Sequence, residues 1–361
     1  MKRIVVVWLI CFLFIVPGSF LHGAVSHHPS LDWRTLESDH FLIHFHNGEL
    51  ELARQTAAVA ESAHERLSRF FNWQPADKTD VVLSDEADNG GGFAMAIPYN
   101  RTTIRVSPAA ARLTGTDDWL ERLFVHEYTH ILHLDKAGGA PLWLRNIFGR
   151  LPFFFPGMLQ PSWLLEGLSS YMERDDEYGA ATRGAAGSTY YDSIMRLETA
   201  HGIKPLNQVS MSLDNSLSDW PGFLTRYTYG LHFYQFLESR YGKEAVMRLV
   251  EEYSDNLIPF MINSNSQRIL GKSLGQLWQE FEQYLHDRYD EKIRSITDSG
   301  YRAETVISSH KSAYSPTMIK DTLYYLEYNG FEHRRLMRMR EGTAEKLIDV
   351  NPGAAIDGNE N

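Results

Sequence analysis

Two histidines and a glutamate occur within five consecutive residues, in the segment His126-Glu127-Tyr128-Thr129-His130. Residues four apart on an α-helix are rotated by about 400°, so both imidazoles lie on one face, about 6 Å apart along the axis. This spacing lets two imidazole nitrogens bind one zinc ion at about 2.0–2.1 Å each. Glu127 lies about 100° round the helix, beside the metal, where its carboxylate can accept a proton from water. The segment therefore predicts a hydrolytic zinc site.

A third zinc ligand is expected on a second helix, which begins near Trp163 with the sequence Trp-Leu-Leu-Glu-Gly. Glu166 lies in the first turn of this helix, and Gly167 beside it lets another backbone come close. Two histidines and one glutamate, with water in the fourth position, are the open coordination typical of a catalytic zinc, whereas a structural zinc has four protein ligands. We therefore expect one zinc ion per chain, bound by His126, His130 and Glu166.

The segments around these motifs predict a small sheet followed by a helical body. The segment Asn89-Gly90-Gly91-Gly92 is expected to be a turn or loop that interrupts the regular elements. Alternating apolar and polar residues predict a strand or hairpin and two short strands, over residues 31–46, 80–83 and 102–106. Amphipathic segments predict helices over residues 49–71, 118–135, 163–174, 188–200, 228–241, 244–253 and 273–296. A sheet followed by helices is an α+β arrangement.

The pattern changes near residue 300. Three short segments of alternating residues predict strands over 322–328, 335–340 and 346–350. Turns are expected before and between them, and the first turn is expected at Ser315-Pro316. The regular spacing of the strands is typical of most of one β-propeller blade, but a lone blade cannot bury its faces and propellers need roughly four to eight. Either these strands pair onto the preceding domain as a meander, or the sequence stops inside a second domain. We favour the second interpretation.

The first 24 residues have the parts of a secretory signal. Lys2 and Arg3 precede an apolar run from Ile4 to Val16, and mostly small residues follow up to Ala24. The run is short for a membrane span. We therefore expect export to the bacterial periplasm or secretion, with an uncleaved signal that anchors the chain to the inner membrane as the alternative.

The composition excludes several classes of protein. Of the 361 residues, 43% are hydrophobic and 22% charged, which excludes a disordered tail, a fibre and a multi-span membrane protein. The net charge of −11 offers no attraction for phosphate backbones, so no nucleic-acid partner is expected. The single cysteine, Cys11, excludes an intrachain disulfide and a cysteine-based zinc site. No pattern in the sequence indicates an oligomeric state.

Three motifs, in this order, resemble the gluzincin zinc metallopeptidases. The pentapeptide H-E-x-x-H at 126–130 is followed by W-x-x-E-G-x-x-x-Y-x-E at 163–173 and by Tyr-Thr-Tyr-Gly at 227–230. The pattern is most similar to the catalytic core of the aminopeptidase family that includes alanyl aminopeptidase and leukotriene-A4 hydrolase. The resemblance covers roughly residues 90–285.

The resemblance implies a role for each matching residue. His126, His130 and Glu166 match the zinc ligands of the family, and Glu127 matches its general base. Tyr227 matches the tyrosine that donates a hydrogen bond to the tetrahedral oxyanion. Loss of a single donor of this kind commonly costs on the order of 10²–10³ in rate. The alternative is that Tyr227, like Tyr229 two residues later, is an ordinary aromatic residue of the core.

The sequence departs from the family pattern at two places. The gap between His130 and Glu166 is longer here than in those aminopeptidases. Their edge-strand motif G-x-M-E-N, whose glutamate holds the free amine of the substrate, has only a faint echo at 92–96, with alanine in place of the glutamate. Aminopeptidase specificity is therefore not carried over, and cleavage of internal or unusual bonds is favoured.

The signal, the core and the tail together resemble exported bacterial peptidases with a TolB-like β-propeller. The expected domains are a signal peptide (1–24), a thermolysin-like gluzincin metallopeptidase domain of α+β class (25–300) and the start of a propeller, about one incomplete blade (301–361). The expected function is zinc-dependent hydrolysis of peptides or proteins outside the cytoplasm. The alternative is an inactive envelope scaffold that retains a metallopeptidase fold.

Other polar and apolar residues near the motifs have competing interpretations. His133 and Asp135 follow the first motif, where helix-end solvation or capping is favoured over metal ligation. Ser170 and Glu173 could hydrogen-bond the ligand histidines, although a solvated helix face explains them about as well. The apolar segment 141–163 is expected to be a loop packed on its own domain; a lid, a groove wall or peripheral membrane contact are the alternatives.

Overall fold

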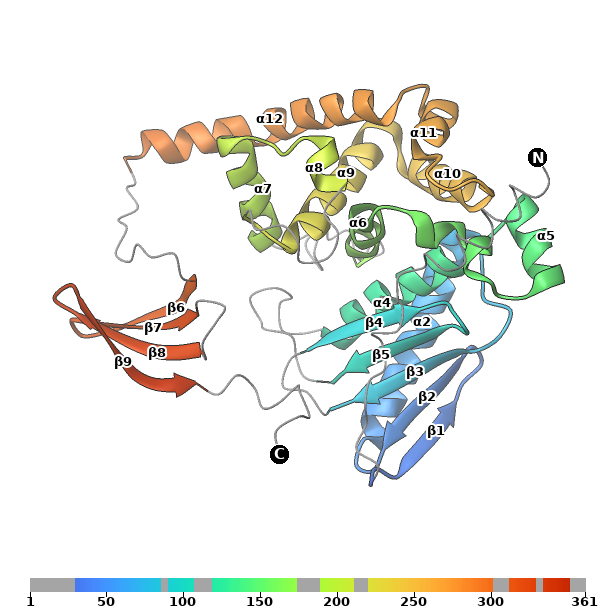
Figure 1. Cartoon of the computed structure of the whole chain (residues 1–361), viewed down its shortest axis with the longest axis horizontal. Coiled ribbons are helices and arrows are strands. Elements are labelled where there is room, and N and C mark those ends of the chain that lie inside the picture. The colour runs from blue at the N-terminus through green and yellow to red at the C-terminus, as the bar shows by residue number, and fades with distance from the viewer. Residues whose placement is uncertain are drawn as a thin grey trace, which may run out of the picture.

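A computed structural model of the chain describes residues 30–85, 90–106, 119–173, 189–210, 220–300, 312–328 and 334–350. The expected signal peptide lies outside these ranges. Figure 1 shows a first sheet, a body of helices over it, and a second sheet near the C-terminal end of the chain. This arrangement agrees with the α+β prediction. Within the described ranges, no helix combines the length and the apolar character that crossing a bilayer requires.

The first sheet has five strands in the order β1-β2-β3-β5-β4. Their bounds are β1 (Trp33–Glu37), β2 (Phe41–His46), β3 (Thr79–Ser84), β4 (Gly91–Met95) and β5 (Arg101–Arg105). β1 and β2 form the predicted hairpin, β2, β3 and β5 run parallel, and β4 is an antiparallel edge strand. The turn or loop predicted at 89–92 is wrong for Gly91 and Gly92, which begin β4. A run of glycines predicts a turn, but these two pair in register with Arg105 and Ile104.

Helices α2 (Leu50–Phe71) and α4 (Trp119–Asp135) pack against each other beside this sheet. Phe41 of β2 contacts both Phe124 and Tyr128 of α4, with ring centroids 5.5 and 5.1 Å apart. The hydroxyl of Tyr128 lies 2.7 Å from Nδ1 of His64 on α2. Tyr128 is the middle residue of the His126–His130 segment. Its packing and its contact with His64 therefore fix the position of that segment of α4.

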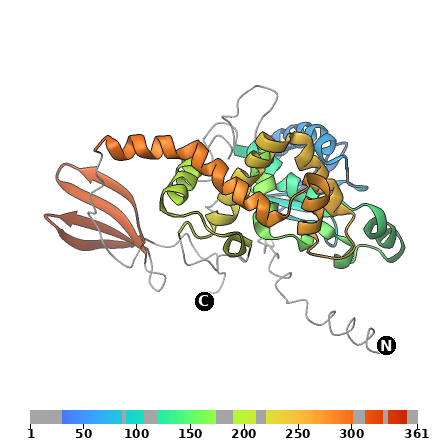
Figure 2. The same cartoon turned by 90° about the horizontal axis from the view of Figure 1, so that it is seen from above.

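The helical body follows the sheet in the sequence. It contains α6 (Ser162–Met172), α7 (Thr189–His201), α8 (Leu206–Ser210), α9 (Leu224–Tyr241), α10 (Lys243–Ser254), α11 (Ile262–Leu270) and α12 (Leu274–Asp298). α9 is buried along most of its length and packs on α6. α12 begins at a capping box formed by Ser273 and Gln276 and runs across the body (Figure 2). The sequence predicted all of these except α8 and α11, which are short.

The apolar segment 141–163 is more ordered than a loop. It contains most of α5 (Gly139–Phe148) and the 3₁₀ turns η2 (Pro152–Phe154) and η3 (Pro156–Leu159). Phe155 is buried between the guanidinium groups of Arg145 and Arg150, at 4.7 and 4.9 Å from its centroid. On α5, by contrast, Trp143 is 62% exposed. The part of the segment around Phe155 therefore packs on its own domain, as predicted, whereas α5 presents apolar side chains to solvent.

The second sheet is antiparallel and has the order β6-β7-β8-β9. Its strands are β6 (Ser312–Ile319), β7 (Thr322–Tyr328), β8 (Arg334–Arg340) and β9 (Thr343–Val350). The turn predicted at Ser315-Pro316 is wrong, because these residues lie within β6 at an irregularity of its pairing with β7. The four described strands form a sheet of their own and do not pair with the first sheet, and they close no propeller.

Candidate metal centre

The three predicted zinc ligands come together between α4 and α6. Oε2 of Glu166 lies 3.2 Å from Nε2 of His126 and 3.2 Å from Nε2 of His130. The two Nε2 atoms are themselves 3.2 Å apart. Ligand atoms bound at 2.0–2.1 Å to one tetrahedral ion are about 3.3 Å apart. The donor set and its spacing therefore fit a zinc ion.

The second nitrogen of each imidazole has a partner that fixes its orientation. Nδ1 of His126 donates to Oε1 of Glu173 over 2.8 Å, and Nδ1 of His130 lies 3.1 Å from Oγ of Ser169. A proton on Nδ1 leaves the lone pair of Nε2 directed at the centre, as metal ligation requires. The structure therefore gives Glu173 the predicted contact. The prediction for Ser170 is wrong, because a shift of one residue rotates a helical side chain by about 100°, and Ser169 makes the contact instead.

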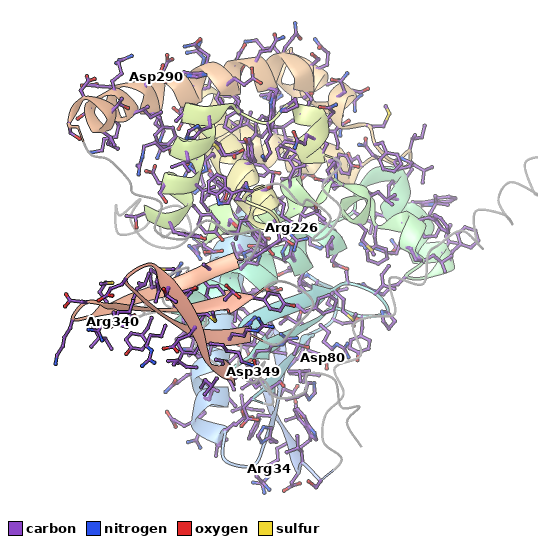
Figure 3. All side chains as sticks on the ribbon, turned by 60° about the vertical axis from the view of Figure 1, so that its left-hand side comes forward. Arg34, Asp80, Arg226, Asp290, Arg340 and Asp349 are labelled. Carbon is purple, nitrogen blue, oxygen red and sulfur yellow. The ribbon has the colours of Figure 1, made fainter. Side chains whose placement is uncertain are left out.

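The carboxylates around His126 and His130 favour a positive charge at the centre. Burial alone would lower the pKa of His126, but hydrogen bonds to Glu166 and Glu173 outweigh burial and raise this pKa well above its usual value. Burial alone would raise the pKa of Glu166, but His130 and His126 outweigh it and hold the carboxyl ionised. Arg226 adds a guanidinium nitrogen 3.7 Å from Oε1 of Glu166. Figure 3 shows Arg226 between the helical body and the first sheet.

Glu127 lies on α4 against the edge strand β4. Its side chain is buried, and this burial raises the pKa of its carboxyl, in part opposed by His126 and His130. Gly92 is the strand residue nearest to it: a Cβ built on Gly92 would lie 2.5 Å from Cδ of Glu127. Because Gly92 has no side chain, the backbone of β4 can pack directly against the carboxylate of Glu127.

Two tyrosines of α9 have different surroundings. The ring centroid of Tyr227 lies 6.0 Å from that of His126, and its hydroxyl accepts from Arg226 over 3.4 Å. Tyr229 is buried in the core, where its hydroxyl donates to Glu198 over 2.5 Å. Burial raises the pKa of Tyr227 far above its usual value, so the hydroxyl keeps its proton and can donate it. Of the two, only Tyr227 lies beside the candidate centre.

His133 and Asp135 are not at a solvated helix end, so that prediction is wrong. Both are buried. Asp135 accepts from Nε1 of Trp73 over 3.0 Å and forms an ion pair with Arg150 at 2.9 Å. His133 lines a cavity together with apolar residues of the helical body, and that cavity shares no lining residue with the three ligands. His133 and Asp135 therefore pack α4 against its neighbours and do not face the group formed by His126, His130 and Glu166.

Sequence reasoning missed three residues at the centre: Ser169, Arg226 and Gly92. Ser169 and Arg226 each stand one residue from a residue that the motifs did single out, Ser170 and Tyr227. Gly92 was noted as part of a glycine run and as the first residue of the faint G-x-M-E-N echo, but its contact with Glu127 was not predicted. No local pattern distinguishes these residues from their neighbours, because their contacts reach across elements.

Comparisons with known proteins give distant likenesses. No protein-family model matches the chain. It is 25% identical over 249 residues to an uncharacterized protein of Treponema pallidum (strain Nichols); the match covers 68% of this chain but only 21% of that relative. The chain thus spans about a fifth of the length of the curated relative that it matches.

Two solved structures are similar to part of the chain. One is an M1 zinc metallopeptidase from Deinococcus radiodurans, a mutant bound to a Tyr-Ser-Ala substrate, with 17% identity, a TM-score of 0.39 and coverage of 71% of this chain and 51% of that one. The other is an aminopeptidase N family protein from Idiomarina loihiensis, with 11% identity, a TM-score of 0.37 and coverage of 89% and 69%.

Proposed function

We propose that the chain is a zinc-dependent hydrolase of peptide bonds with a gluzincin-like catalytic core. One observation carries this proposal: the Nε2 atoms of His126 and His130 and Oε2 of Glu166 lie 3.2 Å from one another. Three protein ligands leave one coordination position for solvent or substrate, which is the pattern of a catalytic zinc.

The residues around the centre would divide the chemistry among them. A bound zinc ion would polarise the scissile carbonyl and lower the pKa of the attacking water. Glu127 would accept the proton of that water and deliver it to the leaving amine; its raised pKa makes the carboxylate a better proton acceptor than an exposed glutamate. Tyr227 would donate its hydroxyl proton in a hydrogen bond to the developing oxyanion. Glu173 and Ser169 would keep the two imidazoles in place.

A peptide is the substrate class that the surroundings favour. β4 pairs on one side with β5 and is the last strand of the sheet, so its other backbone edge can hydrogen-bond an extended peptide. Gly92 brings this edge against Glu127. Ala96 follows the strand where the aminopeptidase motif has a glutamate for the free amine, so we propose cleavage within chains rather than removal of N-terminal residues.

Replacement of Glu127 by Gln tests the proposal. The variant should keep one zinc ion at the centre but lose cleavage of unstructured protein substrates by about 10²-fold or more. Glu121→Gln changes an exposed glutamate of the same helix and should cleave like the wild type. Unchanged turnover in Glu127→Gln would reject the role of Glu127. A wild-type protein that neither binds zinc nor cleaves would favour the alternative, a binding scaffold in the cell envelope.

Export and membrane contact through residues 141–163 stay predictions from the sequence. The exposed side chains of Trp143, Ile147 and Phe148 on α5 are of the type that inserts into lipid interfaces. Fractionation of cells and N-terminal sequencing of the mature protein test the first prediction. Sedimentation with neutral vesicles, with Trp143→Ser and Phe148→Ser for comparison, tests the second.

A further inference from the structure

A second group of side chains that could bind a metal ion lies at one edge of the first sheet. It consists of His46, the last residue of β2, Glu49, which precedes α2, and Asp85, which follows β3. One ligand atom from each residue lies within 4.8 Å of the others. β2 and β3 are parallel neighbours, so their carboxyl ends meet at the same edge. None of these three residues belongs to the centre formed by His126, His130 and Glu166.

His46 is oriented like a metal ligand. Its Nδ1 lies 3.3 Å from the backbone carbonyl oxygen of Asn47, to which an Nδ1–H donates. Its Nε2 lies 2.8 Å from Oδ1 of Asp85 and 3.4 Å from Oε2 of Glu49. With the proton on Nδ1, Nε2 presents a lone pair to two carboxylates. Three negative or electron-rich atoms in such proximity repel one another unless a proton on Nε2 or a metal cation lies among them.

Glu49 provides an independent sign of a missing partner. Its side chain is only 10% exposed. Oε2 accepts from the backbone N–H of His46 over 3.2 Å, whereas Oε1 is buried and finds no hydrogen-bond donor in the described parts of the chain. A buried carboxylate oxygen without a partner is costly, and a bound cation would satisfy it.

Neighbouring histidines show how an ordinary pair differs. Nε2 of His44, two residues earlier on β2, lies 2.6 Å from Oδ1 of Asp80, which Figure 3 labels on the first sheet. Nδ1 of His40 lies 2.6 Å from Oε2 of Glu61. In each pair one ring N–H can satisfy one carboxylate. His46 faces two carboxylates with a single nitrogen, so one N–H cannot satisfy both.

We propose that His46, Glu49 and Asp85 bind a second divalent ion, of the first-row transition type such as Zn²⁺. An imidazole nitrogen together with carboxylates suits such ions better than Ca²⁺, which prefers oxygen ligands throughout. The side chain of Asp85 is 52% exposed, so water can complete the coordination from solvent. The ion links the end of β2, the start of α2 and the end of β3 at the point where the chain leaves the sheet before β4.

The number of bound ions tests this site directly. The full chain is stripped with a chelator, reloaded with Zn²⁺ and desalted, and zinc per chain is measured by elemental analysis. The wild type should bind two ions, and Glu49→Gln and Asp85→Asn one each. His44→Ala is the matched control, because it removes a histidine of the same strand that faces one carboxylate, and it should bind two. Since Asp85 is largely exposed, Asp85→Asn should fold even if Glu49→Gln does not.

A further pair of variants separates this proposal from that for the catalytic centre. Glu166→Gln should bind one ion, and Zn²⁺ should raise its unfolding temperature by several degrees; addition of Asp85→Asn should abolish both effects. If the catalytic centre binds no zinc, the wild type binds one ion and Asp85→Asn binds none. Equal zinc content and equal thermal shifts in the wild type, Glu49→Gln and Asp85→Asn would overturn the second site and assign the group as an imidazolium paired with two carboxylates.

Discussion

Gly167 of α6 and Gly230 of α9 lie backbone against backbone where the two helices cross. A Cβ built on Gly230 would lie 2.5 Å from Cα of Gly167, and it would also overlap the carbonyl oxygen of Trp163. Glu166 directly precedes the first glycine, and Tyr227 stands one turn before the second. The close crossing therefore sets how near Tyr227 comes to the ligands of the candidate centre.

A methyl group at this crossing should separate the two helices. We expect Gly230→Ala to lower the free energy of unfolding by about 1–3 kcal/mol, because overpacking in a tight core forces backbone shifts. The same change should reduce peptide cleavage. Urea unfolding measures the first effect. Gly275→Ala is the control, because a Cβ at that position on α12 has no atom within 4 Å; a Gly230→Ala protein as stable as this control would contradict the proposed role of the crossing.

A methyl group on β4 should act on Glu127 alone. In Gly92→Ala the new Cβ would occupy the space of the Glu127 carboxylate. We expect zinc binding at His126, His130 and Glu166 to persist and cleavage to fall by about 10²-fold, since the base can no longer hold its position. Zinc content and turnover measured on one preparation check both parts. Loss of the metal together with activity would show that β4 supports the ligands instead.

The two tyrosines of α9 should respond in opposite ways to loss of the hydroxyl. Tyr227→Phe should lower the rate of cleavage by about 10²–10³-fold with little change in stability. Tyr229→Phe removes a buried hydrogen bond to Glu198, so it should cost about 1–3 kcal/mol of stability and leave the rate close to that of the wild type. Each variant is the control for the other. Equal rates in both would remove Tyr227 from the mechanism.

The free energy of unfolding should decrease in acid, partly because of His232, a buried residue of α9. Burial lowers its pKa to about 4, with a smaller contribution from Arg288, and its Nδ1 donates to the carbonyl of Thr228. In the unfolded chain the pKa of histidine is about 6.5, so between pH 6.5 and 4 the unfolded state binds one more proton and stability decreases as pH falls. The loss should approach about 3 kcal/mol near pH 4.

His232→Gln isolates this contribution, because the amide does not titrate. Urea unfolding of the variant should depend less steeply on pH than that of the wild type, by up to one proton between pH 6.5 and 4. The difference between the two proteins is the relevant quantity, since burial also lowers the pKa of His133, to about 3. Parallel pH profiles would show that folding does not lower the pKa of His232.

The sequence alone determined the parts of this protein that depend on local periodicity. Helical rotation places His126 and His130 on one face whatever surrounds them, and the apolar stripes of α2, α4 and α12 predict their extents to within two residues. Alternation predicted the β1–β2 hairpin and the later strands of the second sheet. Short or glycine-rich elements such as β4, α8 and α11 were missed, because too few residues repeat the pattern.

The folded arrangement of the helices and strands set which distant atoms face one another. It brought Glu166 to the two histidines, chose Ser169 over Ser170 and Tyr227 over Tyr229, and set Gly92 against Glu127. It also joined His46 to Asp85 across 39 residues. The physical reason is that hydrogen bonds and metal ligation need positions fixed to fractions of an ångström, which the packing of helices and strands provides and the spacing of residues along one chain does not.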